Sequence, residues 1–65
     1  MESNKKLRLE EMCIQSWSQL TSEERERYFY DTGIIGFVED AAAVLNINID
    51  ELPEADLDDI LNKLN

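Results

Sequence analysis

The sequence contains no histidine, only one cysteine and one proline, and two glycines. Histidine is the side chain best suited to proton transfer near neutral pH, so the commonest general acid and base is absent. A lone cysteine cannot form a disulfide within the chain, and Cys13 has no candidate base beside it in the sequence. No nucleophile pair, cofactor loop or calcium-loop motif can be assembled from these residues. We therefore expect no catalysis, no cofactor and no metal site.

Basic residues are also scarce, with six Lys and Arg against 15 Asp and Glu and a net charge of −9. Most of this imbalance lies in residues 31–65, which contain nine Asp and Glu residues and Lys63 as their only basic residue. Because nonspecific nucleic-acid affinity comes from neutralising phosphates, this half of the chain disfavours direct contact with DNA or RNA. Anionic membranes are disfavoured for the same reason. A protein partner with a basic surface is favoured instead.

Long hydrophobic runs are missing as well. No apolar stretch approaches the 18 or more residues of a membrane-spanning helix, and residues 1–12 lack the apolar segment of a secretory signal. With a single cysteine, these features lead us to expect a reduced, cytoplasmic protein.

What is present indicates a folded helical chain: 43% of the residues are hydrophobic and 32% are charged. We predict an all-α fold, a small bundle of three or four short helices, in a single domain spanning residues 1–65. Four helices are expected, at about 5–20, 22–31 and 35–45, with the last opened by Pro53. The third is apolar around most of its circumference and should be the central element.

Local signals mark the helix ends. Thr21 and Glu24 have the spacing of a capping box, which predicts a helix start at this point. Gly33 supplies the left-handed residue that ends the same helix. Between the third and fourth helices, Ile47 and Ile49 should point inward from a turn.

Two helices carry clear apolar stripes. In the first helix, six apolar residues share one face, which should therefore pack in the core. They are Leu9, Met12, Cys13, Ile14, Trp17 and Leu20. The last has a stripe formed by Leu57, Ile60, Leu61 and Leu64. A 65-residue chain hides only about 60% of its surface, so the monomer should be marginal. We therefore expect a homodimer or a tightly held complex.

Two groups of residues are candidates for a protein interface. Tyr28 and Tyr30 point about 160° apart on a helix, so at least one of them should be exposed, close to Arg27. The second group is the acidic start of the last helix, where Asp56, Asp58 and Asp59 can face a basic partner. Its charges also suit the positive end of the helix dipole.

One segment resembles a known family. Residues 43–52 have the sequence Ala-Val-Leu-Asn-Ile-Asn-Ile-Asp-Glu-Leu. They resemble a segment of small helix-turn-helix repressors of the phage repressor type, in which a helix, a turn and a new helix starting at Asp-Glu-Leu follow one another. The resemblance implies a transcriptional regulator. It includes no base-reading position, and residues 31–65 offer no Arg, Lys, Gln or Ser cluster for a major groove, so no DNA-binding residue follows from it.

Three functions remain after these exclusions. The leading hypothesis is a non-catalytic acidic protein–protein interaction module that binds and inhibits or modulates a partner, in particular a basic nucleic-acid-binding factor. The alternative is a homo-oligomeric structural or assembly subunit. The third is a helix-turn-helix-like transcriptional regulator.

Overall fold

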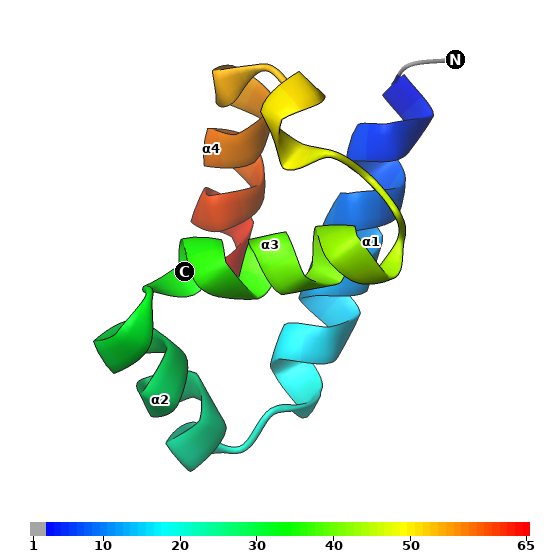
Figure 1. The fold of residues 1–65 in the computed structure, drawn as a ribbon. Helices are drawn as coiled ribbons and strands as arrows, with labels where there is room; N and C mark the ends of the chain where they lie inside the picture. The colour runs from blue at the N-terminus through cyan, green and yellow to red at the C-terminus, as the bar shows by residue number, and fades with distance from the viewer. Residues whose placement is uncertain (1–2) are drawn as a thin grey trace.

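The computed structural model describes residues 3–65, so residues 1 and 2 of the predicted domain lie outside the described range. The described chain is built from helices joined by short connections (Figure 1). In chain order these are α1 (Ser3–Gln19), α2 (Ser22–Asp31), α3 (Ile34–Val44), the short 3₁₀ helix Ile49–Glu51 and α4 (Glu54–Leu64). The prediction of a small all-α bundle is confirmed. None of the helices in residues 3–65 is both long enough and apolar enough to span a membrane.

The predicted helix ends are close to those observed. Thr21 accepts a hydrogen bond from the Glu24 amide, and Glu24 Oε1 accepts one from the Thr21 amide, which completes the capping box. Gly33 adopts the left-handed φ of 81° between α2 and α3. Pro53 lies one residue before α4 rather than inside its first turn. Each of these signals acts over a few residues, which is why the sequence located them well.

α3 lies at the centre of the bundle, as expected. It packs against α1, α2 and α4, whereas α2 packs mainly against α3 and touches α1 at Trp17. Figure 1 shows α3 crossing α1, with α2 and α4 lying on different sides of it. α3 also contributes the largest set of buried residues: Gly36, Phe37, Val38, Ala41 and Ala42.

The core face of α1 is confirmed in part. Leu9, Cys13 and Trp17 are buried in the core, but Ile14 is 42% exposed, so its assignment to this face was wrong. Ile14 is one residue, or 100°, round the helix from Cys13. That rotation carries its side chain out of the interface that α3 and α4 cover.

The apolar stripe of α4 packs inside the same chain. Ile60 and Leu64 are buried in the core, and Leu57 and Leu61 are partly buried against it. Ile47 is buried and Ile49 is partly buried, so both isoleucines of the connection do face the core. The stripe on which the expectation of a dimer rested is therefore used to hold α4 on α1 and α3.

The segment that resembles helix-turn-helix repressors departs from that pattern. α3 ends at Val44, but Asp50 and Glu51 belong to a single 3₁₀ turn, and the next α-helix begins only at Glu54. Asn48 caps the 3₁₀ turn by accepting a hydrogen bond from the Asp50 amide. The helix start at Asp-Glu-Leu that is typical of the repressor segment is therefore absent here, because the Asn48 cap and Pro53 divide the segment into a short turn and a separate helix start.

The Cys13 thiol should be inert in the folded protein. Its side chain has no exposed surface, and burial raises its pKa to about 11, so almost no reactive thiolate forms at pH 8. Iodoacetamide at pH 8 should leave Cys13 unmodified in the native state and alkylate it fully in 6 M guanidinium chloride, as intact mass measures. Fast alkylation of the native protein would contradict this packing.

Candidate protein-interaction site

The two candidate tyrosines lie in different environments, and Tyr30 is the exposed one. Its side chain is 87% exposed on the outer side of α2, so the expectation of at least one exposed tyrosine is confirmed. Tyr28 is partly buried, and its hydroxyl donates a hydrogen bond of 3.0 Å to Asp40 Oδ2 on α3. This hydrogen bond and partial burial raise the pKa of the Tyr28 phenol, so it remains a neutral donor.

Tyr28 belongs to an aromatic cluster that joins α2 to the core. Its ring lies edge-to-face against Phe37, with the two centroids 5.3 Å apart, and Phe37 in turn lies 4.9 Å from Trp17. Phe29 places its ring 5.8 Å from Trp17. Arg25 lies over the Trp17 ring, and its Nε donates a hydrogen bond to the Trp17 carbonyl oxygen. These rings and this arginine form the contact between α2 and the rest of the fold.

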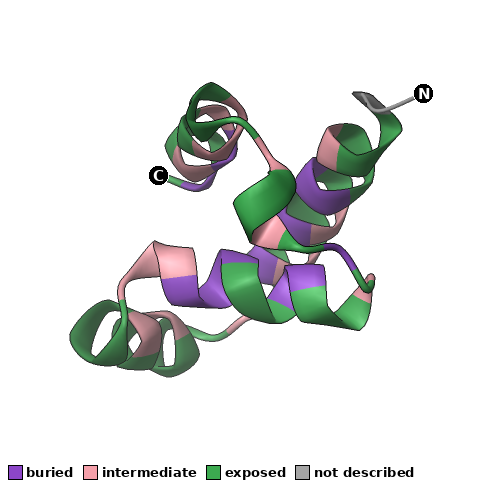
Figure 2. Cartoon of the chain, turned by 45° about the horizontal axis from the view of Figure 1, so that its top comes forward, coloured by how far each residue is buried: buried purple, intermediate pink, exposed green. Residues whose placement is uncertain are grey.

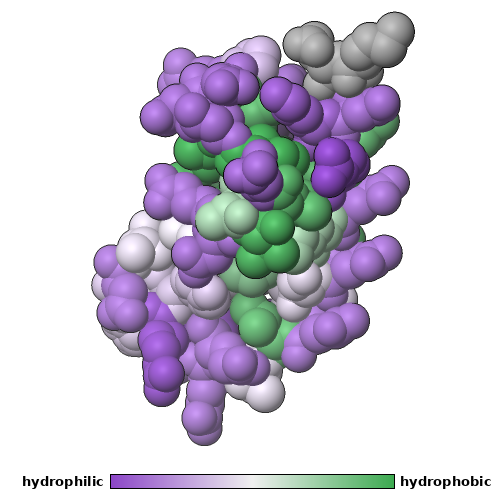
Figure 3. Space-filling view, turned by 45° about the vertical axis from the view of Figure 1, so that its right-hand side comes forward, coloured by the Kyte–Doolittle hydropathy of each residue, from purple (hydrophilic) through white to green (hydrophobic). Residues whose placement is uncertain are grey.

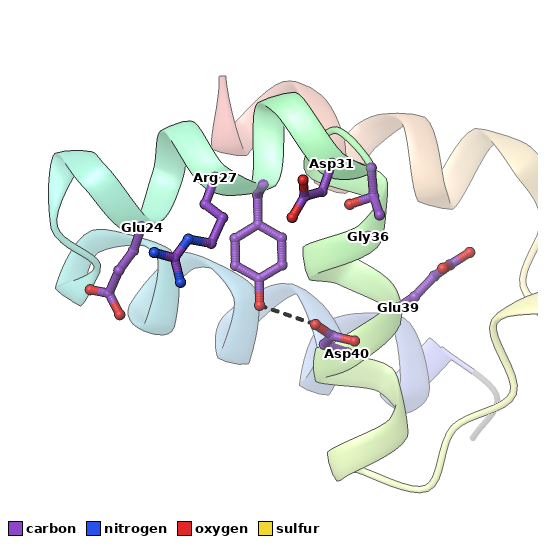
Figure 4. A pocket seen from close by; sticks show the side chains of 8 residues that line it. Glu24, Arg27, Asp31, Gly36, Glu39 and Asp40 are labelled. Atoms are coloured by element: carbon purple, nitrogen blue, oxygen red, sulfur yellow. Dashed lines mark hydrogen bonds between the residues drawn. The ribbon is translucent and has the colours of Figure 1, made fainter.

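A pocket of about 460 Å³ opens between α2 and α3, and we call it the α2–α3 pocket. Figure 4 shows Glu24 and Arg27 side by side on α2 and Asp40 on α3 across from them. Its lining residues are Glu24, Arg27, Tyr28, Asp31 and Thr32 from α2 and its C-terminal cap, and Gly36, Glu39 and Asp40 from α3.

The α2–α3 pocket is strongly acidic. Four carboxylates line it and Arg27 is its only cation. The Glu24 carboxylate also accepts a hydrogen bond from the Thr21 amide, which lowers the Glu24 pKa and keeps this group ionised. Among residues 3–65, no three potential ligand groups converge closely enough to hold a metal ion. The negative charge is spread along the walls, an arrangement that suits an extended cationic side chain.

Gly36 allows α2 and α3 to meet at the end of this pocket. A Cβ atom placed on Gly36 would lie 1.8 Å from Thr32 Oγ1 and 2.5 Å from Thr32 Cβ. No side chain fits at that distance. The absence of a side chain at Gly36 is therefore what brings the C-terminal end of α2 against the first turn of α3.

The three candidate aspartates of α4 do not form one open acidic surface. Asp56 lies in the first turn of α4, and Asp58 is exposed to solvent. Asp59, by contrast, forms ion pairs with Lys6 and Lys63 inside the fold. Asp59 therefore has its charge already compensated, whereas the exposed Asp58 and the half-buried Asp56 form no ion pair among the described residues.

The pairing of Asp59 belongs to a four-membered network between α1 and α4. Lys6 Nζ donates a hydrogen bond of 2.6 Å to Asp59 Oδ2, and Lys63 Nζ donates one to Glu10 Oε1. Lys6 also lies 3.3 Å from Glu10 Oε2. Hydrogen bonding to Lys63 lowers the pKa of Glu10, and hydrogen bonding to Lys6 lowers that of Asp59. The network ties the N-terminal half of α1 to the C-terminal half of α4.

A second pocket, also of about 460 Å³, lies beside α1. Met12 and Leu45 give it an apolar part, while Arg8 and Glu11 give it one charge of each sign. Figure 3, which brings the α1 side of the molecule forward, shows apolar side chains gathered in the middle of this face and hydrophilic ones around them. This pocket has no net charge and so offers no preference for a charged partner.

Sequence reasoning identified Tyr28 and Arg27 but missed the carboxylates that share their pocket. Asp31, Glu39 and Asp40 are among the nine carboxylates counted toward the net charge of residues 31–65, and no pocket was predicted from them. One signal was available: Glu39 and Asp40 follow Gly36 by three and four residues, so all three share one helix face. A glycine on that face indicates close approach of a neighbour, and the carboxylates beside it then face that neighbour.

Comparison with protein-family models, with curated proteins and with solved structures found no match for this chain. Its function must therefore be inferred from its own residues. The α2–α3 pocket is the feature that combines a concave shape with a strong net charge. Tyr30, two residues after the pocket residue Tyr28, is an aromatic side chain that is 87% exposed.

Proposed function

We propose that this protein is a non-catalytic, acidic interaction module that binds a partner with a basic surface and inhibits or modulates it. The observation that carries the proposal is the α2–α3 pocket, which presents four carboxylates against one arginine. A lysine or arginine side chain of a partner would enter a volume that already holds its counter-charges. A basic nucleic-acid-binding factor is the partner class that we favour.

The distribution of basic side chains supports this choice. Lys5, Lys6 and Lys63 are engaged in ion pairs within the fold, with Glu51 or with the network between α1 and α4. Arg25 is held at Trp17. Most of the few cations are therefore already used, and the net charge of −9 remains on the surface. Such a surface steers a basic partner toward encounter and repels nucleic acid itself.

The remaining candidate residues take distinct roles in this proposal. Tyr30, with Arg27 one helical turn before it, supplies an exposed aromatic anchor on α2. Asp56 and Asp58 lie outside the α2–α3 pocket and act as charges that speed encounter. Asp59 is left out of this role because it pairs with Lys6 and Lys63.

The test is affinity capture from lysate of the native host with three forms of the protein. Glu39→Lys places a cation in the α2–α3 pocket, and Glu11→Lys makes the same substitution on an exposed part of α1. We expect wild type and Glu11→Lys to recover the same basic protein in stoichiometric amount and Glu39→Lys to lose it. Equal recovery by both variants would refute the pocket as the binding site. Recovery of the protein's own copies alone would favour the homo-oligomeric alternative.

Kinetics with the recovered partner separate the two kinds of contact. Tyr30→Ala should speed dissociation and weaken binding by about 2 kcal/mol, as expected of an interface anchor. Asp56→Asn combined with Asp58→Asn should slow association at low salt and leave dissociation unchanged, because exposed charges act mainly on encounter. Surface plasmon resonance across a salt series measures both rates. Unchanged dissociation of Tyr30→Ala would remove Tyr30 from the interface.

A further inference from the structure

α2 is the helix with the weakest hold on the core. None of its ten residues is buried, whereas every other α-helix contributes buried side chains (Figure 2). Its main neighbour is α3, and it touches α1 only around Trp17 among the described residues. Its attachment includes the Tyr28 and Phe29 rings, the Arg25 contacts with Trp17 and the hydrogen bond from the Tyr28 hydroxyl to Asp40. Regions with few buried apolar contacts open at a lower free energy than the global fold.

The chain on either side of α2 is suited to a hinged movement. α2 is separated from α1 by Leu20 and Thr21 and from α3 by Thr32 and Gly33. Gly33 already has a φ of 81°, and a Cβ atom there would meet no other atom within 4 Å. Glycine can adopt this backbone angle and others without a Cβ penalty, so rotation at Gly33 costs mainly the hydrogen bond from its amide to the Tyr28 carbonyl oxygen. The capping box at Thr21 lies within the start of α2, so α2 keeps its own N-terminal cap when it moves.

Charges across the α2–α3 pocket favour separation of the two helices. Glu24 and Asp31 of α2 line it together with Glu39 and Asp40 of α3, and Arg27 is the only counter-charge among its lining residues. Within a pocket of about 460 Å³ such groups lie inside the screening length of low-salt solution, which is roughly 30 Å at 0.01 M. Asp31 also places a negative charge in the last turn of α2, at the negative end of its dipole.

We infer that α2 docks and undocks as a unit over Trp17 and Phe37, and that the charge in the α2–α3 pocket sets this equilibrium. The undocked state keeps α1, α3 and α4 packed and exposes the aromatic rings that α2 covers. This inference deepens the proposed function, because the same pocket that would receive a basic partner regulates the helix. The docking equilibrium itself is a property of the protein alone and is tested without any partner.

Native-state hydrogen exchange at low salt is the test, with Cys13 as an internal reference for opening of the core. We expect amides within α2 to exchange at least ~10-fold faster than the slowest amides of α1, α3 and α4, after correction for intrinsic rates. Iodoacetamide labelling of Cys13 should follow the slow class. If α2 amides and the Cys13 thiol report the same opening equilibrium, the domain opens only as a whole and the inference is wrong.

The role of charge is tested by Glu39→Lys with Glu11→Lys as its matched control. Glu39 lies on α3, so its replacement leaves the helix propensity of α2 unchanged and acts only across the pocket. We expect Glu39→Lys to slow exchange in α2 by about threefold to tenfold at low salt, and the difference to vanish near 0.5 M NaCl, where charges are screened. Glu11→Lys should leave the ratio between α2 and the other helices unchanged. Equal effects of the two variants would exclude the pocket as the source.

A decalysine peptide then separates this inference from the proposed function. Bound in the α2–α3 pocket, it should slow exchange in α2 in wild type and have less effect on Glu39→Lys. If α2 opens as expected and responds to Glu39→Lys but not to decalysine, the docking equilibrium stands and binding of basic segments in the pocket fails. If α2 does not open separately, the docking equilibrium fails whatever decalysine does.

Discussion

Replacing Trp17 by alanine should remove a large part of the protein's stability at 25 °C. Trp17 is 7% exposed, and its ring contacts the rings of Tyr28, Phe29 and Phe37. The Arg25 guanidinium also lies over the Trp17 ring. Truncating a buried tryptophan to alanine costs about 3–5 kcal/mol. A chain of this length has a total stability of about 3–10 kcal/mol at the usual value per residue. The substitution therefore removes a large part of the free energy of unfolding.

Urea unfolding followed by circular dichroism measures this effect. Tyr30→Ala is the matched control, because it also truncates an aromatic side chain but one that is 87% exposed, and its unfolding midpoint should stay near that of wild type. Trp17→Phe should fall between the two, since it keeps a ring in the cluster. A Trp17→Ala variant as stable as Tyr30→Ala would mean that the aromatic cluster contributes little to the fold.

The second large effect is expected from Gly36→Ala, a change that would normally stabilise a helix interior by about 1 kcal/mol. Here the new Cβ would lie 2.5 Å from Thr32 Cβ, which is attached directly to the backbone and cannot rotate away. The ends of α2 and α3 must therefore move apart. We expect the free energy of unfolding to fall by about 1–3 kcal/mol, the usual cost of overpacking.

A double-mutant cycle with Thr32→Gly isolates the steric cause. Thr32→Gly removes all three side-chain atoms that crowd the new methyl group, so Gly36→Ala should be tolerated in its presence and recover its ordinary helix preference. Urea midpoints of the four proteins give the coupling energy. Additive effects, with no recovery in the double variant, would contradict the close approach of Thr32 and Gly36.

The fold was predictable where the deciding interactions are local. Thr21 and Glu24 are three residues apart and set the start of α2 by themselves, and Gly33 sets its end through its own backbone. The α1 core face followed from 100° periodicity because Cys13 and Trp17 share it. Ile14 was misplaced because periodicity gives directions but does not say how much of the circumference neighbouring helices cover.

The candidate site depends on contacts between residues that are far apart in the sequence, and local patterns do not predict such contacts. Asp59 pairs with Lys6 across 53 residues, so its charge looked free until α1 and α4 were placed side by side. The α2–α3 pocket likewise exists only because the two helices meet at Gly36, which turns Asp40 toward Tyr28. Tyr30 was foreseen as one of two alternatives, since helix geometry requires that one of Tyr28 and Tyr30 face solvent.

The ion-pair network between α1 and α4 makes this fold respond to ionic strength while remaining indifferent to acidity in the physiological range. The pKa values of Glu10 and Asp59 lie below their ordinary values of 4.5 and 3.8, so their stabilisation is complete above those values and is lost only as the pH falls through the lowered ones. The pKa values of Lys6 and Lys63 are raised above their ordinary value of 10.5. The stabilisation that these two lysines contribute is therefore complete below pH 10.5 and is lost only in stronger base. The chain has no histidine, so no side chain with an ordinary pKa near 7 changes its charge around neutral pH and weakens the packing of α4. Salt screens every one of these pairs, so raising the ionic strength at neutral pH should weaken the attachment of α4 to α1.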